Sequence, residues 1–177
     1  AAYDQDFPAN TAVLLAGVPD SDTEALLAGP VASQLRAKKQ LLVWDRFLTE
    51  SEESLLYGAA DVVWLGYRGH YGSSGVLAQA AQARRPIIAC AEGVIGWQTR
   101  RHDLGATVDV SRPAQVITAL KELLRWEGRP FGTSSGVPKA LASTKAEAQA
   151  ELARALDASD GGHGRRTGTA GARHSQN

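Results

Sequence analysis

The sequence contains no methionine and only one cysteine, Cys90, among its 177 residues. A single cysteine excludes an internal disulfide framework and a zinc site built from cysteines. No run of about 18 apolar residues occurs, so we expect no membrane-spanning helix. No basic segment followed by an apolar one opens the chain, so we expect no signal peptide and a cytoplasmic location. The missing initiator methionine favours a piece of a longer protein over removal of the initiator alone.

Neither sign of charge is in excess, because 19 basic residues face 19 acidic ones. Nucleic acids and anionic membranes select a basic excess, so the balance argues against either as the main partner. Apolar residues make up 44 % of the chain, which is enough to bury a core. The length fits about one domain with a tail.

Segments typical of strands and of helices alternate from residue 11 to residue 127. Short apolar runs that end near Gly, Pro or Asp predict strands within 11–19, 40–45, 61–67, 86–90 and 106–110. Helical patterns cover 21–29, 31–39, 49–60, 75–84 and 112–128. This alternation predicts an α/β layered fold with a mainly parallel sheet.

Several single residues carry local predictions. Ser21 or Asp22 is the expected N-cap of the first helix. Thr49 precedes Glu52 by three residues, which is the spacing of a capping box. Trp44 and Trp64 lie within strand patterns, so we expect both in the core.

The ends of the chain differ from its middle. Residues 1–10 form a polar lead-in, and residues 11–131 form the predicted domain. Residues 132–177 are expected to be a linker and a disordered C-terminal tail, and residues 157–177 contain no core-forming residues. Within them, residues 145–157 are rich in helix formers and could form one more helix.

A small turn, Gly72-Ser73-Ser74-Gly75, stands between the third strand and an Ala- and Gln-rich helix. Ligands of parallel sheets bind outside the carboxyl ends of the strands, which is where this turn lies. The first N–H groups of a helix have no partner within it and form an anion site. The turn could therefore hold a phosphate, or Ser could cap the helix while the glycines allow tight packing. It is not a P-loop, because it lacks the Gly-Lys-Ser/Thr ending.

The ordered set "AADVVWLGYR", "SSGVL", "RRP" and Gly93 resembles the C-terminal domain of GT-B glycosyltransferases of the glycosyltransferase 4 type. The resemblance covers about residues 11–127 and implies a Rossmann-like half that binds a nucleotide-sugar donor. It implies that the loop 45–47 lies near the nucleobase. The donor-binding residues that it implies are Gly17, Arg46, Arg68, Tyr71, Ser73, Ser74, Gly75, Val76 and Gln79.

The sequence departs from that pattern in two ways. Two glutamates that many members carry are replaced by Tyr71 and Gln79, so no carboxylate pair is left to imply a metal or other cofactor. Nothing upstream of Thr11 could supply the family's first strand and helix, whose Arg and Lys neutralise the diphosphate. Arg46, Arg68, Arg84 or Arg85 could substitute in part. The N-terminal acceptor domain is also missing.

Three functions stay open. The first is the donor-binding half of a hexosyltransferase-like enzyme, whose intact form would lie near a membrane if its acceptor is a polysaccharide or a lipid-linked sugar. The second is a non-catalytic nucleotide-binding or scaffold module that kept the fold. The third is a receiver-like domain with Asp20, Asp22 and Asp45 as its acidic residues. His70 could act as a base beside the turn.

Overall fold

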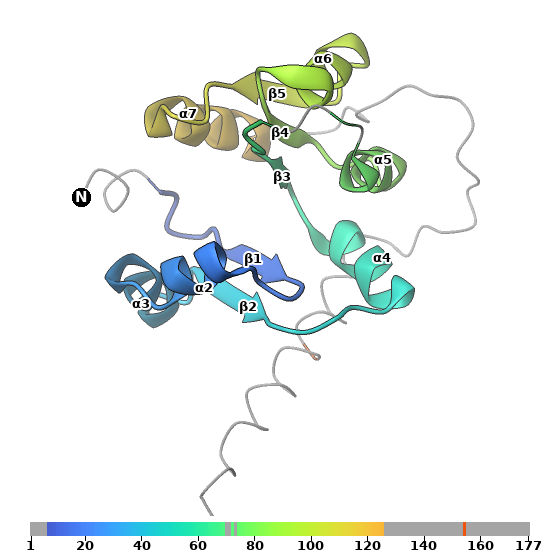
Figure 1. Ribbon diagram of the computed structural model, residues 1–177. Helices are drawn as coiled ribbons and strands as arrows, with labels where there is room; N and C mark the ends of the chain where they lie inside the picture. Colours follow the sequence, from blue (N-terminus) through green and yellow to red (C-terminus); the bar gives the residue numbers. More distant parts are fainter. Residues whose placement is uncertain (1–6, 70–71, 73, 126–153, 155–177) are drawn as a thin grey trace, which may run out of the picture.

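The computed structural model describes residues 7–69, 72, 74–125 and 154. This part of the chain is α/β and compatible with a Rossmann-like fold (Figure 1). Its strands are β1 (Val13–Ala16), β2 (Leu41–Trp44), β3 (Val63–Leu65), β4 (Ile87–Cys90) and β5 (Gly105–Val108). Its helices are α2 (Ser21–Leu27), α3 (Pro30–Ala37), α4 (Glu50–Ala59), α5 (Gly75–Gln82), α6 (Gly93–Arg101) and α7 (Pro113–Leu124).

The predicted tail lies almost wholly outside the described residues. Of the helix expected over 145–157, only Arg154 is described, with helical backbone. The lead-in is described only from Phe7 onward. All regular elements from β1 to α7 fall inside the predicted domain, residues 11–131.

The strands form two small parallel sheets instead of the single sheet that the sequence predicts. β1 pairs with β2, and β3, β4 and β5 form a second sheet with β4 in the middle. All pairs are parallel, with Val13 opposite Leu41 and Val63 opposite Ile87. Parallel pairing was therefore predicted correctly, but the continuity of the sheet was not, because β1 and β3 do not pair with each other.

The core is built around β4, whose four residues are all buried. On one face, Ile87 and Ala89 join a cluster with residues of β3, α5 and α6. On the other face, Ile88 packs with Val108 and Ala119, so α7 covers that side. A strand that is covered on both faces has an uninterrupted apolar sequence, which is why "IIAC" predicts a strand so clearly.

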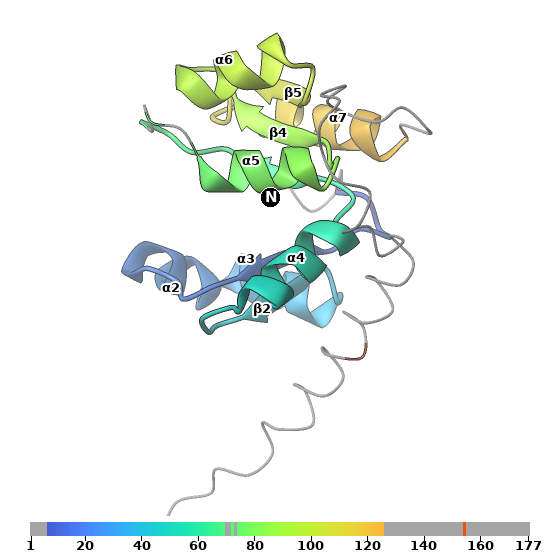
Figure 2. The same cartoon turned by 90° about the vertical axis from the view of Figure 1, so that its right-hand side faces the viewer.

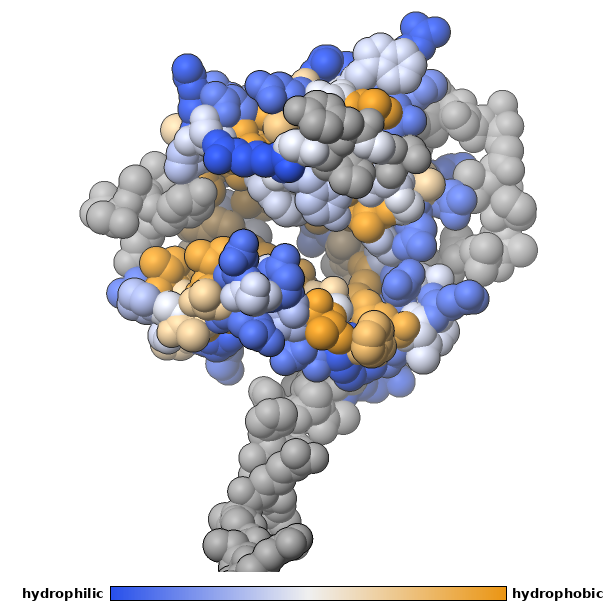
Figure 3. All heavy atoms as spheres, in the orientation of Figure 1, coloured by the Kyte–Doolittle hydropathy of each residue, from blue (hydrophilic) through white to orange (hydrophobic). Residues whose placement is uncertain are grey.

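The order of the strands reverses at the space between β1 and β3. The chain passes from β1 to β2 on one side and from β3 through β4 to β5 on the other (Figure 1). Because the crossovers of parallel sheets are right-handed, such a reversal is the topological switch point of the fold. The space-filling view is hollowed between the two layers, with hydrophobic residues along its lower wall (Figure 3).

Helix starts follow the local sequence closely. The capping box at α4 is present as predicted, since Thr49 Oγ1 accepts from Glu52 N and a Glu52 carboxylate oxygen accepts from Thr49 N at 2.8 Å. The N-cap of α2 is Asp20, whose carboxylate accepts from Thr23 N at 2.8 Å. Ser21 and Asp22 were the wrong choice, because both already lie inside the helix.

Two tryptophans that the sequence places in the core behave differently. Trp44 is 5 % exposed, as predicted. Trp64 is 49 % exposed, so its prediction is wrong, and its indole folds over Gly66. Trp64 lies on β3, which is an edge strand and pairs, among the described strands, with β4 alone.

The close approach of β5 to β4 requires glycine at position 105. Gly105 has φ +146°, and a Cβ there would collide with the backbone of Ile87. We expect Gly105→Ala to lower the free energy of unfolding by about 3 kcal/mol or more, through the collision and the backbone strain. Urea denaturation measures the change. Gly75→Ala is the control, because a methyl group there meets nothing within 4 Å and should cost less than about 0.5 kcal/mol.

The start of α4 should make stability depend on acid pH. Arg46, followed by the backbone and hydroxyl of Thr49, lowers the pKa of Glu52 to about 2. A carboxylate with a lowered pKa stabilises the fold above its ordinary pKa of 4.5, and this contribution is lost as the pH falls toward 2. We expect Glu52→Gln to destabilise the protein at pH 7, with a difference from wild type that narrows between pH 4.5 and pH 2.

Denaturant titrations at pH 7, 4 and 2.5 test this dependence. Glu50→Gln is the matched control, since Glu50 lies in the same first turn and has the same favourable position at the helix N-terminus. Equal losses for the two variants at every pH would show that the contacts of Glu52 with Arg46 and Thr49 contribute nothing beyond the helix dipole.

Candidate functional site

The carboxyl ends of the strands gather at one edge of the molecule (Figure 2). Gly17 follows β1 and has φ +123°, and its N–H donates to Trp44 O at 3.0 Å. A Cβ at Gly17 would meet nothing within 4 Å, so the space in front of it is open. The turn after β3 reaches the same edge with Gly66 and Gly69. Of the predicted site, Tyr71 and Ser73 lie outside the described residues, as does His70.

The N-terminus of α5 is open at this edge. Ser74 is the N-cap, with extended backbone at φ −117° and ψ 128°, and its hydroxyl makes no capping hydrogen bond. Among the described residues, none accepts from the N–H groups of Gly75, Val76 or Leu77. Gly75 is exposed, and a Cβ there would meet nothing within 4 Å. Three backbone donors at this helix end therefore have no acceptor among the described residues.

The rest of α5 holds that end in place. Leu77 and Ala80 are buried in the cluster with Leu65 and Ile87, and the side chain of Val76 packs against the same cluster. Val76 was expected at the site, and only its backbone N–H is free to serve there. The helix is thus anchored through its apolar face on β3 and β4, while Gly75 at its start stays exposed.

Arg68 adds positive charge to the same edge. It is exposed and follows β3 by three residues. The hydroxyl and N–H of Ser111, with the nearby charges of Arg112 and Arg68, hold the pKa of Asp109 below its ordinary value. Asp109 also contacts Arg112 at 3.2 Å. Arg68 thus acts on the residues that follow β5, and it follows β3 in the same stretch of chain that leads to α5.

Arg46 is engaged elsewhere. Its guanidinium contacts both carboxylate oxygens of Glu52, at 2.7 Å and 3.1 Å, and lies 5.0 Å from the ring centroid of Trp44. Arg85 donates to the carbonyls of Tyr57 and Gly58 at the end of α4. Burial of Arg85 lowers its pKa. Both arginines serve α4, one at each of its ends, so neither is free to neutralise a diphosphate.

Gln79 also points to α4. Its amide Nε2 donates to the carboxylate of Glu53 at 3.3 Å. This places a carboxylate of α4 beside Gln79, one of the residues that the sequence predicted at the donor site. Glu53 was not among the sequence-predicted site residues, because its cluster of acids was assigned only to the start of a helix. No local signal in the sequence links Glu53 to a residue 26 positions away.

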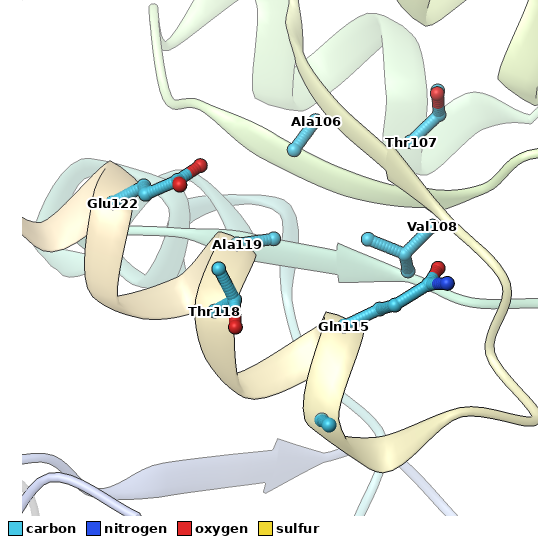
Figure 4. Close-up of a pocket in the computed structure, with 8 residues that line it drawn as sticks. Ala106, Thr107, Val108, Gln115, Thr118, Ala119 and Glu122 are labelled. Carbon is cyan, nitrogen blue, oxygen red and sulfur yellow. The ribbon is translucent and has the colours of Figure 1, made fainter.

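Cavities are found at both ends of the described strand set. One of about 300 Å³ lies at the end of β1 and is lined by Gly17, Asp20, Thr23 and the apolar residues around them. A larger one of about 390 Å³ lies between β5 and α7, where Gln115 extends toward the strand (Figure 4). Gln115 Oε1 accepts from Asp109 N at 3.1 Å. The larger cavity is at the outer strand, away from the switch point, so the strand-end geometry favours the smaller one.

Neither a metal centre nor a membrane segment is found in the described part of the chain. No three His, Cys, Asp or Glu side chains of the described residues gather as metal ligands would. In the same residues, no helix combines the length and apolar character needed to cross a membrane. The donors at the strand ends are backbone N–H groups and an arginine, which suits an anion and not a cation.

Comparisons with protein-family models, with curated proteins and with solved structures found no significant match for this chain.

Proposed function

We propose that the chain is the donor-binding half of a GT-B glycosyltransferase, which holds the diphosphate of a nucleotide-sugar at the N-terminus of α5. The observation that carries this proposal is the open first turn of that helix. Gly75, Val76 and Leu77 present N–H groups that no described residue accepts from, and a Cβ at Gly75 would meet no described atom within 4 Å. The positive end of a helix dipole favours a phosphate at this position.

The position of the turn in the fold supports the same function. It follows β3 at the topological switch point, where open α/β sheets bind nucleotides. Gly17 bounds the other side of that point and leaves open space in front of it. Arg68 supplies the positive charge that Arg46 and Arg85 do not, because those two are bound to groups of α4.

The chemical role of the site is to stabilise a leaving group. Negative charge grows on the nucleoside diphosphate as the glycosidic bond breaks, and fixed N–H donors stabilise that charge without reorganising. Breaking the bond productively requires an acceptor in the line of attack, which the acceptor domain of a complete enzyme supplies. We therefore propose that this chain binds the donor and needs that second domain for turnover.

A non-catalytic nucleotide-binding module is the second candidate, and one contact favours it. Gln79, at a position where the resembling enzymes have a glutamate, is bound to Glu53 of α4 and not directed at the strand ends. An amide held in this way makes weaker bonds to a ribose than a free carboxylate would. Such a module would bind the nucleoside diphosphate at the same helix and never release a sugar from it.

Replacing Gly75 tests the anion site directly. We expect UDP or GDP to raise the melting temperature of the wild-type chain by mass action. Gly75→Asp should weaken this binding at least about tenfold, because its carboxylate repels the diphosphate at close range. The same carboxylate stabilises the first turn of α5, so the variant should melt no lower than wild type.

Gly75→Asn is the matched control, with the same shape and no charge. It should retain most of the binding, measured by isothermal titration alongside the thermal shift. The proposal fails if neither nucleotide shifts the wild-type melting temperature at millimolar concentration. It also fails if the Asp and Asn variants bind equally well.

A further inference from the structure

β1 and β3 each leave one backbone edge unpaired, and the two edges face each other across the switch point (Figure 1). Val13 N and Gly17 N donate to Gln40 O and Trp44 O, which lie on the β2 side. Successive N–H groups of a strand point to opposite edges, so those of Leu14 and Ala16 point away from β2. A strand inside a fold pairs such groups with a neighbour.

The same reasoning applies to β3. Val63 N donates to Pro86 O at 2.9 Å, on the side of β4. The N–H of Trp64 therefore points the other way, toward β1. Among the described residues, β3 pairs only with β4 and β1 only with β2, so nothing described here receives these outward groups. The gap thus has backbone donors on both of its walls.

The side chains on both walls have the composition of central strands. β1 reads Val-Leu-Leu-Ala and β3 reads Val-Trp-Leu, without a charge or a proline. Natural edge strands usually carry a charged residue or a proline, which prevents pairing with other chains. Yet Val13 and Leu15 are each 38 % exposed and Trp64 is 49 % exposed. These strands are built for burial on both sides and are at edges only because a neighbour is missing.

We propose that an extended, apolar polypeptide segment from outside these 177 residues inserts between β1 and β3 and joins the two sheets into one. The space between the layers is hollowed and partly walled by hydrophobic residues (Figure 3). Only a peptide backbone satisfies donors and acceptors on two facing strands at once. This inference concerns assembly and does not depend on the proposed nucleotide site.

Other occupants fit less well. Residues 1–6 and 126–177 contain no run of four consecutive apolar residues, so this chain offers no spare strand of the right kind. A second copy would have to place one of its own strands in the gap. Every described strand of a second copy is already paired within its own sheet, so none is free on both edges as an inserted strand must be.

Hydrogen exchange of the dilute chain alone gives the first test. We expect amides of β4 to exchange at least about tenfold more slowly than those of Leu14, Ala16 and Trp64, because β4 alone among the described strands is paired on both edges. Protection of the three outward amides at the level of β4 in a monomeric sample would overturn the proposal, since the gap would then be closed by the chain itself. Protection that grows with protein concentration would assign the gap to a second copy.

The second test adds a probe, the acetylated and amidated peptide Lys-Thr-Val-Ile-Val-Val-Thr-Lys. It should slow exchange in residues 12–18 and in residues 61–67 together. Two backbone-methylated versions provide the controls, one methylated at alternate residues and the other at the residues between them. An inserted strand uses both sets of N–H groups, so each version should lose protection in both segments. If only one methylated version loses protection, the peptide adds to the edge of a single strand, and the proposal is overturned. The proposal is also overturned if the unmethylated peptide protects neither segment.

Ala16→Pro removes one outward N–H without touching the bonds between β1 and β2. We expect it to weaken peptide binding about tenfold, the cost of one lost pairing group at a buried edge. Ala16→Val keeps the N–H, favours strand backbone and should bind as wild type does. Equal binding by the Pro and Val variants would show that the peptide does not pair with β1.

Discussion

Backbone groups that leave water must find hydrogen-bond partners, and this requirement shapes both halves of the molecule. In β4 it is met on both edges, as Ile87 N donates to Leu104 O and Pro86 O accepts from Val63 N. With its backbone satisfied, β4 can be buried on both faces, and α5, α6 and α7 pack against its sheet. In β1 the requirement is met on one edge only, and the strand stays half exposed. The same apolar composition therefore gives a core in one sheet and a surface in the other.

The candidate site depends on the sheet of β3, β4 and β5, in which the backbone of the central strand is hydrogen-bonded on both edges. The first turn of α5 is held at the strand ends because Leu77 and Ala80 are buried against β3 and β4. That anchoring fixes the direction of the N–H groups of Gly75 and its neighbours, which have no acceptor among the residues that the structure describes. Fixed donors are worth more to a developing anion than mobile ones, because they need no reorganisation. Packing of Leu77 and Ala80, two and five residues along the helix, thus supports the binding chemistry proposed for its start.

Local signals account for most of what the sequence predicted correctly. The start of α4 followed from Thr49 and Glu52, which lie three residues apart and contact each other directly. The five strands followed from apolar runs of ordinary length. α6 was missed, because "GVIGWQTRR" contains two glycines and weak helical periodicity. It is stabilised by tertiary packing, with Gly96 against the carbonyls of Cys90 and Ala91 and with Ile95 and Thr99 buried.

Partners distant in sequence were beyond prediction. The pattern located Arg46 and Gln79 near the expected site, but it gave no sign that α4 binds both of them through Glu52 and Glu53. Likewise, an apolar run such as that around Trp64 predicts a strand without saying whether a neighbouring strand exists to cover it. Burial is a property of the assembled sheet, so the exposure of Trp64 could be found only in the structure.

The two proposals meet at the switch point, although each stands on different atoms. An inserted strand would pair with the outward groups of Leu14, Ala16 and Trp64, and its end would emerge between Gly17 and Gly66. Those glycines flank the approach to α5, so the inserted segment would form a wall of the anion site. Donors that face a closed crevice act through a lower effective dielectric than donors on an open surface. Completing the sheet would therefore strengthen a site that the chain on its own presents only in part, and it would do so without altering Gly75 or its neighbours.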